Sequence, residues 1–381
     1  MKIAIFGAGL MGATIARDLV KSNKVDEVTV HDVERRRLRA LRGRERSSKL
    51  AIRVHDVRDT RKTAQLLKRF DVGIGALPHG MSEYAIRSTI DARVNFVDLI
   101  YGWRFGQASI NSECRRRGIT IIPACGLAPG LTNLLAMKGS EEMSNVDEVH
   151  IMVGGVPEKR KPPLNYRIVF SFQAVLEEYL RKARIIKNRK VVNVAALSGL
   201  ETITFPPPIG KCECFYTDGL STLVQTIRGV REMDEKTIRW PGHAAQIKTL
   251  IECGLLDTRP VTCNRAVITP REFLSNVLSE KLALRKEKDL TLLRVEVSGK
   301  KDGKTTRHRF QMVDHYDSRH GITSMARTTA FPCSIAAQIL GSGRIEQKGL
   351  VPPEIAFKAD LRDELLSYVS DRGMKIESRF L

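Results

Sequence analysis

The stretch "KIAIFGAGLMG", residues 2–12, determines the expected fold of the N-terminal part of the chain. It opens with a short apolar run, and the residues from Ala13 onward carry apolar side chains at helical spacing. The glycines between them suit a tight turn at Gly7, close approach of a pyrophosphate at Gly9 and close helix packing at Gly12. The stretch therefore predicts a strand, a phosphate-binding turn and a helix.

An acidic residue downstream strengthens this prediction. Asp32 ends the next apolar run, "EVTVHD", 20 positions after Gly12, where a carboxylate accepts hydrogen bonds from an adenosine ribose. Such a carboxylate repels a 2′-phosphate and so favours NAD. Arg35, Arg36 or Arg37 could instead pair with the 2′-phosphate of NADP. We therefore expect NAD, with NADP left open.

Apolar runs alternate with helix-like segments up to about residue 129, which predicts an α/β fold with a Rossmann-type, doubly wound parallel sheet. Ligands of such sheets bind beyond the carboxyl ends of the strands. The residues expected to bind the cofactor are Gly7, Ala8, Gly9, Leu10, Met11, Gly12, Asp32, Asp56, Val57, Ala76, Leu77, Pro78, Leu99, Ala128 and Pro129.

The pattern changes near residue 130, where alternating runs predict a second, α+β domain with a mixed, more antiparallel sheet. The pair Asp302-Gly303 between two such runs predicts a hairpin. We expect a dinucleotide-binding domain over residues 1–129 and a substrate-binding and dimerisation domain over 130–324. The helical segment 325–381 is expected to pack back on the first domain.

The chain has 381 residues and a net charge of +20, concentrated in part at 34–46, which carries seven Arg and two Glu. No aromatic residues interleave these arginines, which argues against nucleic-acid binding, although a basic dinucleotide-sensing protein without catalysis is left open. The sequence shows no secretory signal or long apolar span, so we expect a soluble cytoplasmic protein with no membrane contact. Its seven cysteines have no framework spacing, and Cys212 and Cys214 lack further ligands, so we expect reduced thiols and no metal site.

Several strings across the chain are more distinctive than the glycine turn. They are "GLAPGLTN" at 126–133, "VGGVP" at 153–157, "PPLNY" at 162–166, "FYTDGLSTL" at 215–223, "TIRWPGH" at 237–243 and "SMARTTAF" at 324–331. With the N-terminal turn they resemble the lysine 6-dehydrogenase group within the saccharopine dehydrogenase-like family, from near residue 1 to about residue 355.

The resemblance implies a homodimeric enzyme of lysine metabolism. Its implied reaction is NAD-dependent oxidation of the ε-amine of L-lysine to the 6-semialdehyde, which cyclises to piperideine-6-carboxylate. The glutamate-forming saccharopine dehydrogenases commonly have Asp where this sequence has Ala128, which counts against saccharopine as substrate. A saccharopine-type or carboxynorspermidine-type reaction at another C–N bond stays open.

Oxidation of an amine by hydride transfer requires a neutral amine, a carbon held against the nicotinamide and an acceptor for protons. His243, which titrates near neutrality and follows a Pro-Gly turn, is the expected general acid or base. Asp98 and Asp218 are the acidic candidates for catalysis, and Asp218 could equally be a turn residue.

The substrate-binding candidates come mainly from the second domain. Arg239 could bind a substrate carboxylate through two hydrogen bonds, or could form a structural ion pair. Tyr216 and Thr217 are expected to line the pocket. Asn133 is expected to cap a helix or to contact the substrate.

Overall fold

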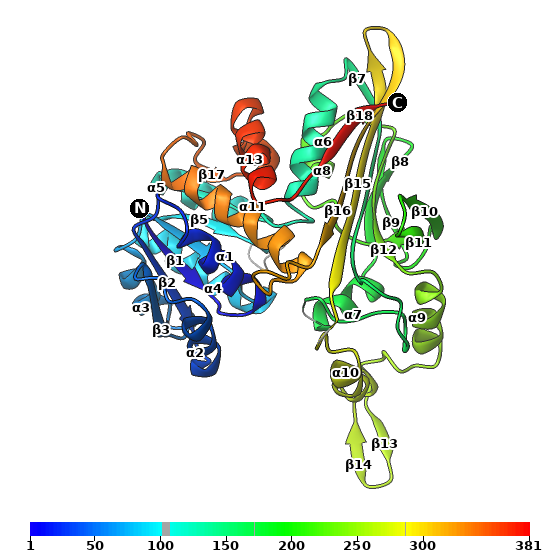
Figure 1. Cartoon of the computed structure of the whole chain (residues 1–381), viewed down its shortest axis with the longest axis horizontal. Coiled ribbons are helices and arrows are strands. Elements are labelled where there is room, and N and C mark those ends of the chain that lie inside the picture. The colour runs from blue at the N-terminus through cyan, green and yellow to red at the C-terminus, as the bar shows by residue number, and fades with distance from the viewer. Residues whose placement is uncertain (101–106, 171, 286) are drawn as a thin grey trace. The chain divides into compact units, whose positions relative to one another are not determined.

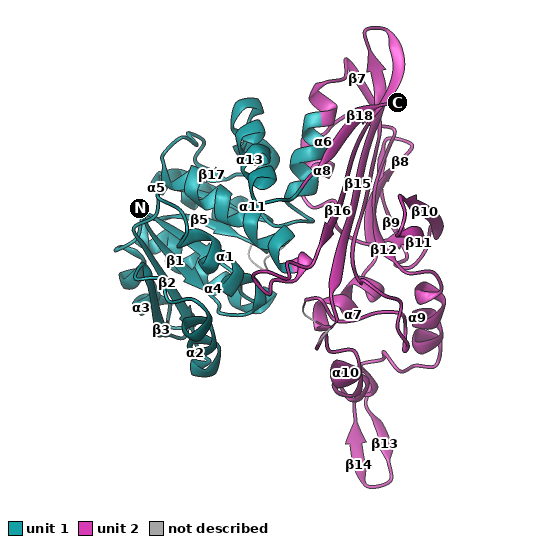
Figure 2. Cartoon of the chain, in the orientation of Figure 1, with its two compact units in different colours: residues 1–138, 326–374 teal, residues 139–325, 375–381 magenta. Residues whose placement is uncertain are grey.

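The computed structural model describes residues 1–100, 107–170, 172–285 and 287–381. The chain forms two compact units, coloured separately in Figure 2. Unit 1 comprises Met1–Lys138 and Ala326–Met374, and unit 2 comprises Gly139–Met325 and Lys375–Leu381. Each unit is built around its own large sheet.

Unit 1 contains a parallel sheet flanked by helices (Figure 1). Within the described residues its seven strands follow the order β17-β6-β5-β4-β1-β2-β3, and each neighbouring pair is parallel. Its strands are β1 (Lys2–Phe6), β2 (Glu27–Asp32), β3 (Leu50–Val54), β4 (Val72–Gly75), β5 (Asn95–Asp98), β6 (Thr120–Ile122) and β17 (Gly349–Leu350). Its helices are α1 (Leu10–Leu19), α2 (Arg35–Arg44), α3 (Thr60–Leu67), α4 (His79–Ala92), α5 (Gln107–Arg117), α12 (Pro353–Ala356) and α13 (Ala359–Asp371), together with most of α6 (Leu131–Glu141) and α11 (Ser324–Gly341).

This strand order confirms the predicted Rossmann-type sheet. The chain leaves β1 toward β2 and β3 on one side and later returns to β4, β5 and β6 on the other, so the order reverses beside β1. The reversal leaves room at the carboxyl end of β1, which is where the glycine turn lies. Strands buried on both faces read as continuous apolar runs, and this is why "KIAIF" was recognisable from sequence. Strand β17 of the C-terminal segment pairs with β6 through Gly349 and Leu350, within unit 1.

Unit 2 contains a mixed sheet, also as predicted. Its strand order is β10-β11-β12-β7-β15-β16-β18, with β8 pairing beside it with β12 and β9, and the β12–β7 pair is parallel. Its strands are β7 (Asn145–Pro157), β8 (Ala183–Lys187), β9 (Lys190–Val194), β10 (Glu201–Phe205), β11 (Gly210–Tyr216), β12 (Glu232–Arg239), β13 (Val261–Cys263), β14 (Ala266–Ile268), β15 (Asp289–Lys301), β16 (Lys304–His315) and β18 (Glu377–Phe380). Its helices are α7 (Phe172–Leu180), α8 (Leu223–Thr226), α9 (His243–Glu252) and α10 (Pro270–Lys281).

The hairpin predicted at Asp302-Gly303 joins β15 to β16, with Lys301 opposite Lys304. Asp302 and Gly303 have φ angles of 51° and 78°, as a two-residue turn with both central residues in the left-handed region requires. The prediction of this turn is confirmed.

Strand β12, by contrast, was not predicted as a strand. Its sequence, "EMDEKTIR", resembles a solvated segment because five of its eight residues are charged, yet all but its first residue are buried. The charges have partners on other elements: Asp234 lies 2.8 Å from His150, and Lys236 lies 3.0 Å from Glu201. Side-chain pairing of this kind depends on tertiary contacts and leaves no periodic signal in the sequence.

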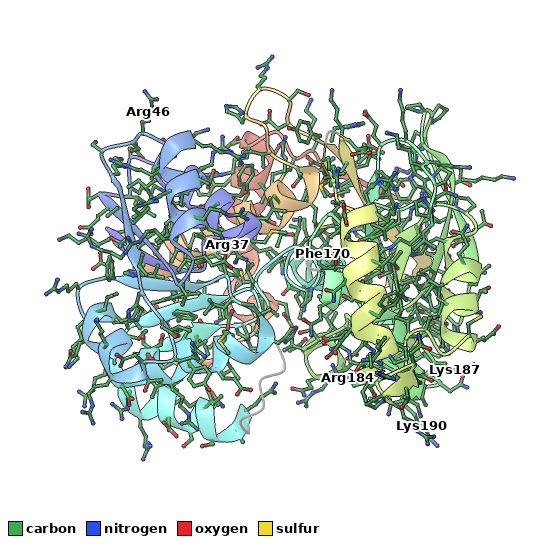
Figure 3. The ribbon with its side chains drawn as sticks, turned by 90° about the horizontal axis from the view of Figure 1, so that it is seen from below. Arg37, Arg46, Phe170, Arg184, Lys187 and Lys190 are labelled. Atoms are coloured by element: carbon green, nitrogen blue, oxygen red, sulfur yellow. The ribbon has the colours of Figure 1, made fainter. Side chains whose placement is uncertain are left out.

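The arginine-rich segment forms helix α2, whose Leu38 and Leu41 are buried while its arginines are exposed. Arg37 pairs with Glu34 at 2.7 Å, and Arg46 reaches away from the fold (Figure 3). The run is therefore a solvated helix face. Across the part of the chain that the structure describes, no helix is long and apolar enough to cross a membrane.

Candidate functional site

The three glycines of unit 1 differ in what the protein itself requires of them. A Cβ at Gly7, where φ is +104°, would lie 2.3 Å from the Ala76 carbonyl oxygen, and one at Gly12 would lie 1.9 Å from the Gly7 oxygen. A Cβ at Gly9 would meet nothing within 4 Å, and φ there is −68°. Gly7 and Gly12 are thus required by packing, whereas Gly9 keeps space open at the N-terminus of α1. The expected cofactor loop Gly7–Gly12 fits the backbone approach of a pyrophosphate.

Asp32 lies beside this loop, as predicted. Its buried carboxylate accepts a hydrogen bond from Ala8 N at 2.6 Å through Oδ2 and one from Glu34 N at 2.7 Å through Oδ1. Each oxygen has a second lone pair, so the carboxylate can still accept from a ribose hydroxyl. Asp32 therefore holds the loop against β2 while keeping the acceptors that an adenosine ribose needs.

The ends of β4 and β1 bring Ala76, Leu77 and Pro78 next to the glycine turn. Ala76 N donates to Phe6 O at 2.9 Å, and Pro78 precedes α4 as its N-cap.

Asp56 and Val57, both expected to bind the cofactor, have different surroundings. The Asp56 carboxylate accepts hydrogen bonds from the Arg58 guanidinium at 2.6–3.0 Å.

Val57, the other member of that pair, is 6% exposed and packs in the core of unit 1. Its side chain therefore points inward, and only its backbone remains available to a cofactor.

Asp98 ends β5 and is fully buried. Its carboxylate accepts from the Ser82 hydroxyl and from Ile100 N, and its carbonyl accepts from Cys125 N. These bonds hold the ends of β5 and β6 together, which is a structural role. Leu99, the next residue, lies next to Gly126, where a Cβ would come within 3.4 Å of Leu99 Cδ2.

The stretch after β6, "GLAPG", folds back on itself. Gly126 N donates to Pro129 O at 3.1 Å, and a Cβ at Gly130, where φ is +132°, would lie 2.3 Å from the Gly126 oxygen. Ala128 and Pro129, joined by a cis peptide bond, are half-buried at the apex of this loop, among residues that are otherwise buried.

Asn133 on α6 stabilises the same loop through hydrogen bonds of its side chain. It accepts from Gly130 N at 3.1 Å and donates to Glu354 at 3.1 Å, and it is fully buried. Its contacts are those of a cap and brace, as the capping alternative predicted, and they leave no surface for a substrate.

In unit 2, Arg239 is the centre of a buried polar cluster. Its side chain is 2% exposed and lies over the rings of Tyr166 and Tyr179, with its guanidinium carbon 5.0 and 5.7 Å from the ring centres. Its Nε donates to the Tyr179 hydroxyl at 2.9 Å, and Tyr179 bonds His243 Nε2 at 2.9 Å. His243 Nδ1 lies 2.8 Å from the carbonyl oxygen of Leu164.

The Leu164 carbonyl is the last group in this series of hydrogen bonds, and it determines which atom donates in each of them. Because a carbonyl only accepts, His243 must donate through Nδ1 and accept the Tyr179 hydroxyl proton at Nε2. Burial and the charge of Arg239 lower the pKa of His243 to about 3, so the ring is neutral. Both ring nitrogens are engaged, Nε2 with Tyr179 and Nδ1 with the Leu164 carbonyl, which does not favour the predicted acid or base role.

Four buried polar atoms near this cluster lack hydrogen-bond partners among the described residues. They are Nη2 of Arg239, Oε2 of Glu235, Oγ of Ser221 and the hydroxyl oxygen of Tyr166, whose ring lies under Arg239. Arg239 Nη2 does lie 3.5 Å from Glu178 Oε2, as an ion pair. Folded proteins rarely leave buried polar groups unsatisfied, so ordered water or a polar ligand is expected to bond these atoms.

The remaining candidates of unit 2 lie around this cluster or away from it. Thr217 is buried and hydrogen-bonds the Thr237 hydroxyl at 2.9 Å, on the same face of β12 as Arg239. Tyr216 pairs in register with Lys236, whose side chain alternates to the opposite face, so the sheet separates Tyr216 from Arg239.

Asp218 is engaged in ion pairs, which limits its part in catalysis. It lies 3.4 Å from Arg181 and 3.2 Å from Arg184, and Arg184 appears in Figure 3 beside the hairpin tip at Lys187 and Lys190. These contacts join the turn after β11 to the segment after α7, and the carboxylate bonds Arg184 rather than the backbone of its own turn.

Sequence reasoning missed Tyr179, Glu178, Glu213 and Glu235. Glu213 accepts from Gly242 N at 2.7 Å and from Ala244 N at 2.6 Å, so its carboxylate satisfies the N-terminus of α9. The alternation of Glu235, Thr237 and Arg239 was the available signal, but it required recognising β12 as a strand.

No group of three or more His, Cys, Asp or Glu in the described residues is arranged to hold a metal ion. The cysteines are free thiols, and Cys212 and Cys214 are buried on β11.

Comparisons with known proteins show the family of the chain. Residues 3–122 match the saccharopine dehydrogenase NADP binding domain, and residues 126–374 match the saccharopine dehydrogenase C-terminal domain. The chain is 23% identical to the mitochondrial alpha-aminoadipic semialdehyde synthase of Bos taurus, over 98% of this chain and 47% of that protein. It therefore spans about half the length of that relative. It is 22% identical to the NADP(+), L-glutamate-forming saccharopine dehydrogenase of Saccharomyces cerevisiae, over 83% of this chain and 86% of the relative.

Solved structures share the fold. The apo L-Glu-forming saccharopine dehydrogenase of Saccharomyces cerevisiae superposes with a TM-score of 0.84 at 20% identity, covering 100% of this chain and 99% of that one. The homospermidine synthase of Legionella pneumophila, solved in complex with NAD, superposes with a TM-score of 0.68 at 11% identity, covering 100% and 91%.

The two domain matches cover most of the chain in the order expected from its motifs. They identify unit 1 as an NAD(P)-binding domain, and the chain belongs to the saccharopine dehydrogenase family.

Proposed function

We propose that this chain is an NAD(P)-dependent oxidoreductase that transfers hydride at a carbon–nitrogen bond of an amino-acid amine. The observation that carries the proposal is the open space at Gly9, between two packing-required glycines and beside Asp32. NAD(P) supplies the hydride acceptor when bound. Asp32 and the α1 N-terminus would hold its ribose and pyrophosphate.

NAD is the proposed cofactor of the two. The Asp32 carboxylate is fixed by two backbone donors, so it cannot easily turn away from a 2′-phosphate. Of the arginines that would favour NADP, Arg37 already pairs with Glu34. Arg35 and Arg36 are exposed on α2 and are the groups to test for NADP use.

In unit 2 we propose that Arg239 binds a substrate carboxylate. Its Nη2 lacks a hydrogen-bond partner, and Tyr179 fixes its Nε. His243 then acts through Tyr179 as a positioning residue. A guanidinium held in this way binds a carboxylate with little loss of side-chain freedom.

The amine itself has two candidates. The saccharopine dehydrogenase relatives favour a saccharopine-type secondary amine. The half-buried Ala128 favours the ε-amine of L-lysine, because the glutamate-forming relatives commonly have Asp at this position.

Purified protein tests the proposal directly. L-lysine, saccharopine and carboxynorspermidine would each be offered with NAD and with NADP at alkaline pH, and reduced cofactor measured by absorbance. We expect turnover of one amine, at least tenfold faster with NAD. Absence of reduction with every amine would contradict the proposed reaction, and faster turnover with NADP would contradict the cofactor choice.

A further inference from the structure

Glu235 is a buried carboxyl for which the proposed reaction has no role so far. It lies on β12 and is 5% exposed. The structure gives its side chain no hydrogen bond or ion pair within the described residues, and Oε2 lacks any hydrogen-bond partner. A buried carboxyl of this kind is costly to the fold, which calls for a compensating role.

The surroundings of Glu235 are acidic. Three negative charges act on Glu235. They belong to Glu178 on α7, Asp218 in the turn after β11 and Asp234 on β12, and Arg181 supplies the opposing positive charge. Asp218 already pairs with Arg181, so this arginine does not neutralise Glu235. Burial, followed by the charges of Glu178 and Asp218, raises the pKa of Glu235 to about 8.

The backbone at Gly219 packs directly against the Glu235 carboxyl. A Cβ at Gly219 would lie 1.8 Å from Glu235 Oε1, so the turn that carries Asp218 fits against the carboxyl only as glycine. Ser221, two residues further on, has a buried hydroxyl oxygen without a partner. Glu235 Oε2 and Ser221 Oγ are therefore both unsatisfied within unit 2.

Glu235 and Arg239 share one face of β12, four residues apart. Their Cα atoms are separated by about 13 Å along the strand, and Thr237, bonded to Thr217, lies between them on this face. The face thus offers a cation at one end and an acid at the other. An amino acid with a distal amine carries the complementary pair of charges.

We propose that Glu235 binds the distal ammonium group of an amino-acid substrate whose carboxylate is bound by Arg239. This inference rests on the proposed function for the substrate class and adds the residue that recognises the amine. An ammonium group brings its own N–H donors, which Glu235 Oε2 and Ser221 Oγ can accept. Glu178, which lies 3.5 Å from Arg239 Nη2, has a side chain that is 30% exposed.

Binding should change protonation in a measurable way. Glu235 is protonated at pH 7 in the free protein and must ionise to pair with an ammonium group, so binding releases close to one proton. Below pH 8 the dissociation constant should fall by up to about tenfold per pH unit as pH rises. Above about pH 9 proton release should vanish, because Glu235 is already ionised.

Calorimetry on the full chain with saturating NADH tests this without requiring turnover. L-lysine and L-norleucine, which lacks the distal amine, would be titrated in two buffers of different ionisation enthalpy. We expect L-lysine to bind at least tenfold more tightly than L-norleucine and to release a proton at pH 7.

Glu235→Gln is nearly isosteric with the protonated carboxyl and should fold normally. It should bind L-lysine at least tenfold more weakly, without proton release, while leaving L-norleucine binding unchanged. Glu235→Asp should restore part of the affinity. Glu252→Gln, an exposed acid on α9, makes the same charge change away from the cluster and should change neither affinity nor proton release.

Equal binding of L-lysine by the wild type and Glu235→Gln, or no binding by the wild type, would overturn the inference. Proton-linked binding without hydride transfer would instead contradict the proposed reaction and leave the ammonium site standing. The two failures are therefore distinguishable.

Discussion

The glycine turn of unit 1 and the Arg239 cluster of unit 2 are built in opposite ways. The turn presents mainly backbone atoms, because Gly7, Gly9 and Gly12 have no side chains, and a ligand can therefore approach Gly9. The cluster is made of large side chains, Tyr166, Tyr179 and His243, packed around a guanidinium. A backbone site leaves a local sequence signature, because consecutive residues form it. A side-chain site draws on distant segments and leaves almost none.

The largest effect is expected at Gly12. In Gly12→Ala the new Cβ would lie 1.9 Å from the Gly7 oxygen, so the turn must shift, at a cost of about 3 kcal/mol in the free energy of unfolding. Denaturant unfolding and NAD titration should both show the damage. Unchanged stability would mean that packing does not require this glycine.

Gly9→Ala separates ligand approach from packing. The added methyl group meets nothing within 4 Å in the protein, so the melting temperature should stay within a degree or two. NAD should bind about ten to a hundredfold more weakly, because the methyl group occupies the space left for the pyrophosphate. NAD affinity equal to that of the wild type would remove the main support for the proposed function.

Tyr179→Phe tests whether the cluster positions Arg239. Removal of the hydroxyl leaves Arg239 Nε and His243 Nε2 without their shared partner. We expect KM for the amino-acid substrate to rise about tenfold, with a smaller change in kcat, since a positioning role affects binding of the carboxylate. Tyr368→Phe on α13 is the matched control, and a large fall in kcat alone would point to proton transfer instead.

Asp32→Asn tests the cofactor choice. Loss of the negative charge should reduce the preference for NAD over NADP by about tenfold, or about 1.4 kcal/mol. Asparagine keeps only one acceptor oxygen for Ala8 N and Glu34 N, so a melting curve must accompany the binding data. An unchanged ratio, with a loss for Arg35→Ala, would assign the preference to α2.

The smallest effect is expected at His31, which is buried against Phe6 with both ring nitrogens unpartnered among the described residues. Burial and the nearby His55 lower its pKa from 6.5 to about 3. The unfolded chain therefore binds the proton more readily, and stability falls as pH drops from about 6.5 toward 3.

His31→Phe should remove this acid sensitivity and stabilise the protein at pH 7 by about 1 kcal/mol. His55→Phe should not stabilise the protein at pH 7, because it breaks a bond to Thr63. Steeper acid unfolding of His31→Phe than of the wild type would contradict this assignment.

Much of unit 1 could be predicted from the sequence. Strand β2 was expected at "EVTVHD" and runs over Glu27–Asp32, because apolar runs and glycine turns are local signals. The loop of Gly7, Gly9, Gly12 and Asp32 was predicted for the same reason. The domain boundaries, the dimer, the cytoplasmic location and the substrate stay predictions.

The candidate site of unit 2 was predicted only in part. Arg239 and His243 were chosen from the "TIRWPGH" string. Arg239 keeps its proposed role, but the role of His243 changed because Tyr179 and Leu164 bond its ring nitrogens. Tyr216 was expected to line the substrate pocket, and strand alternation places it on the face of β12 opposite Arg239. Val57 was expected to flank adenine, and it packs in the core.

The sequence by itself determined the Rossmann-type unit, its phosphate turn and the Asp302-Gly303 hairpin, because each depends on neighbouring residues and on backbone conformations that few residue types adopt. Only the tertiary structure decided that β12 is a buried strand, that His243 is neutral and bonded at both nitrogens, and that Glu235 lacks a partner. Burial and hydrogen bonding between distant segments set the charge state and the direction of a side chain. Those interactions exist only after the chain has folded.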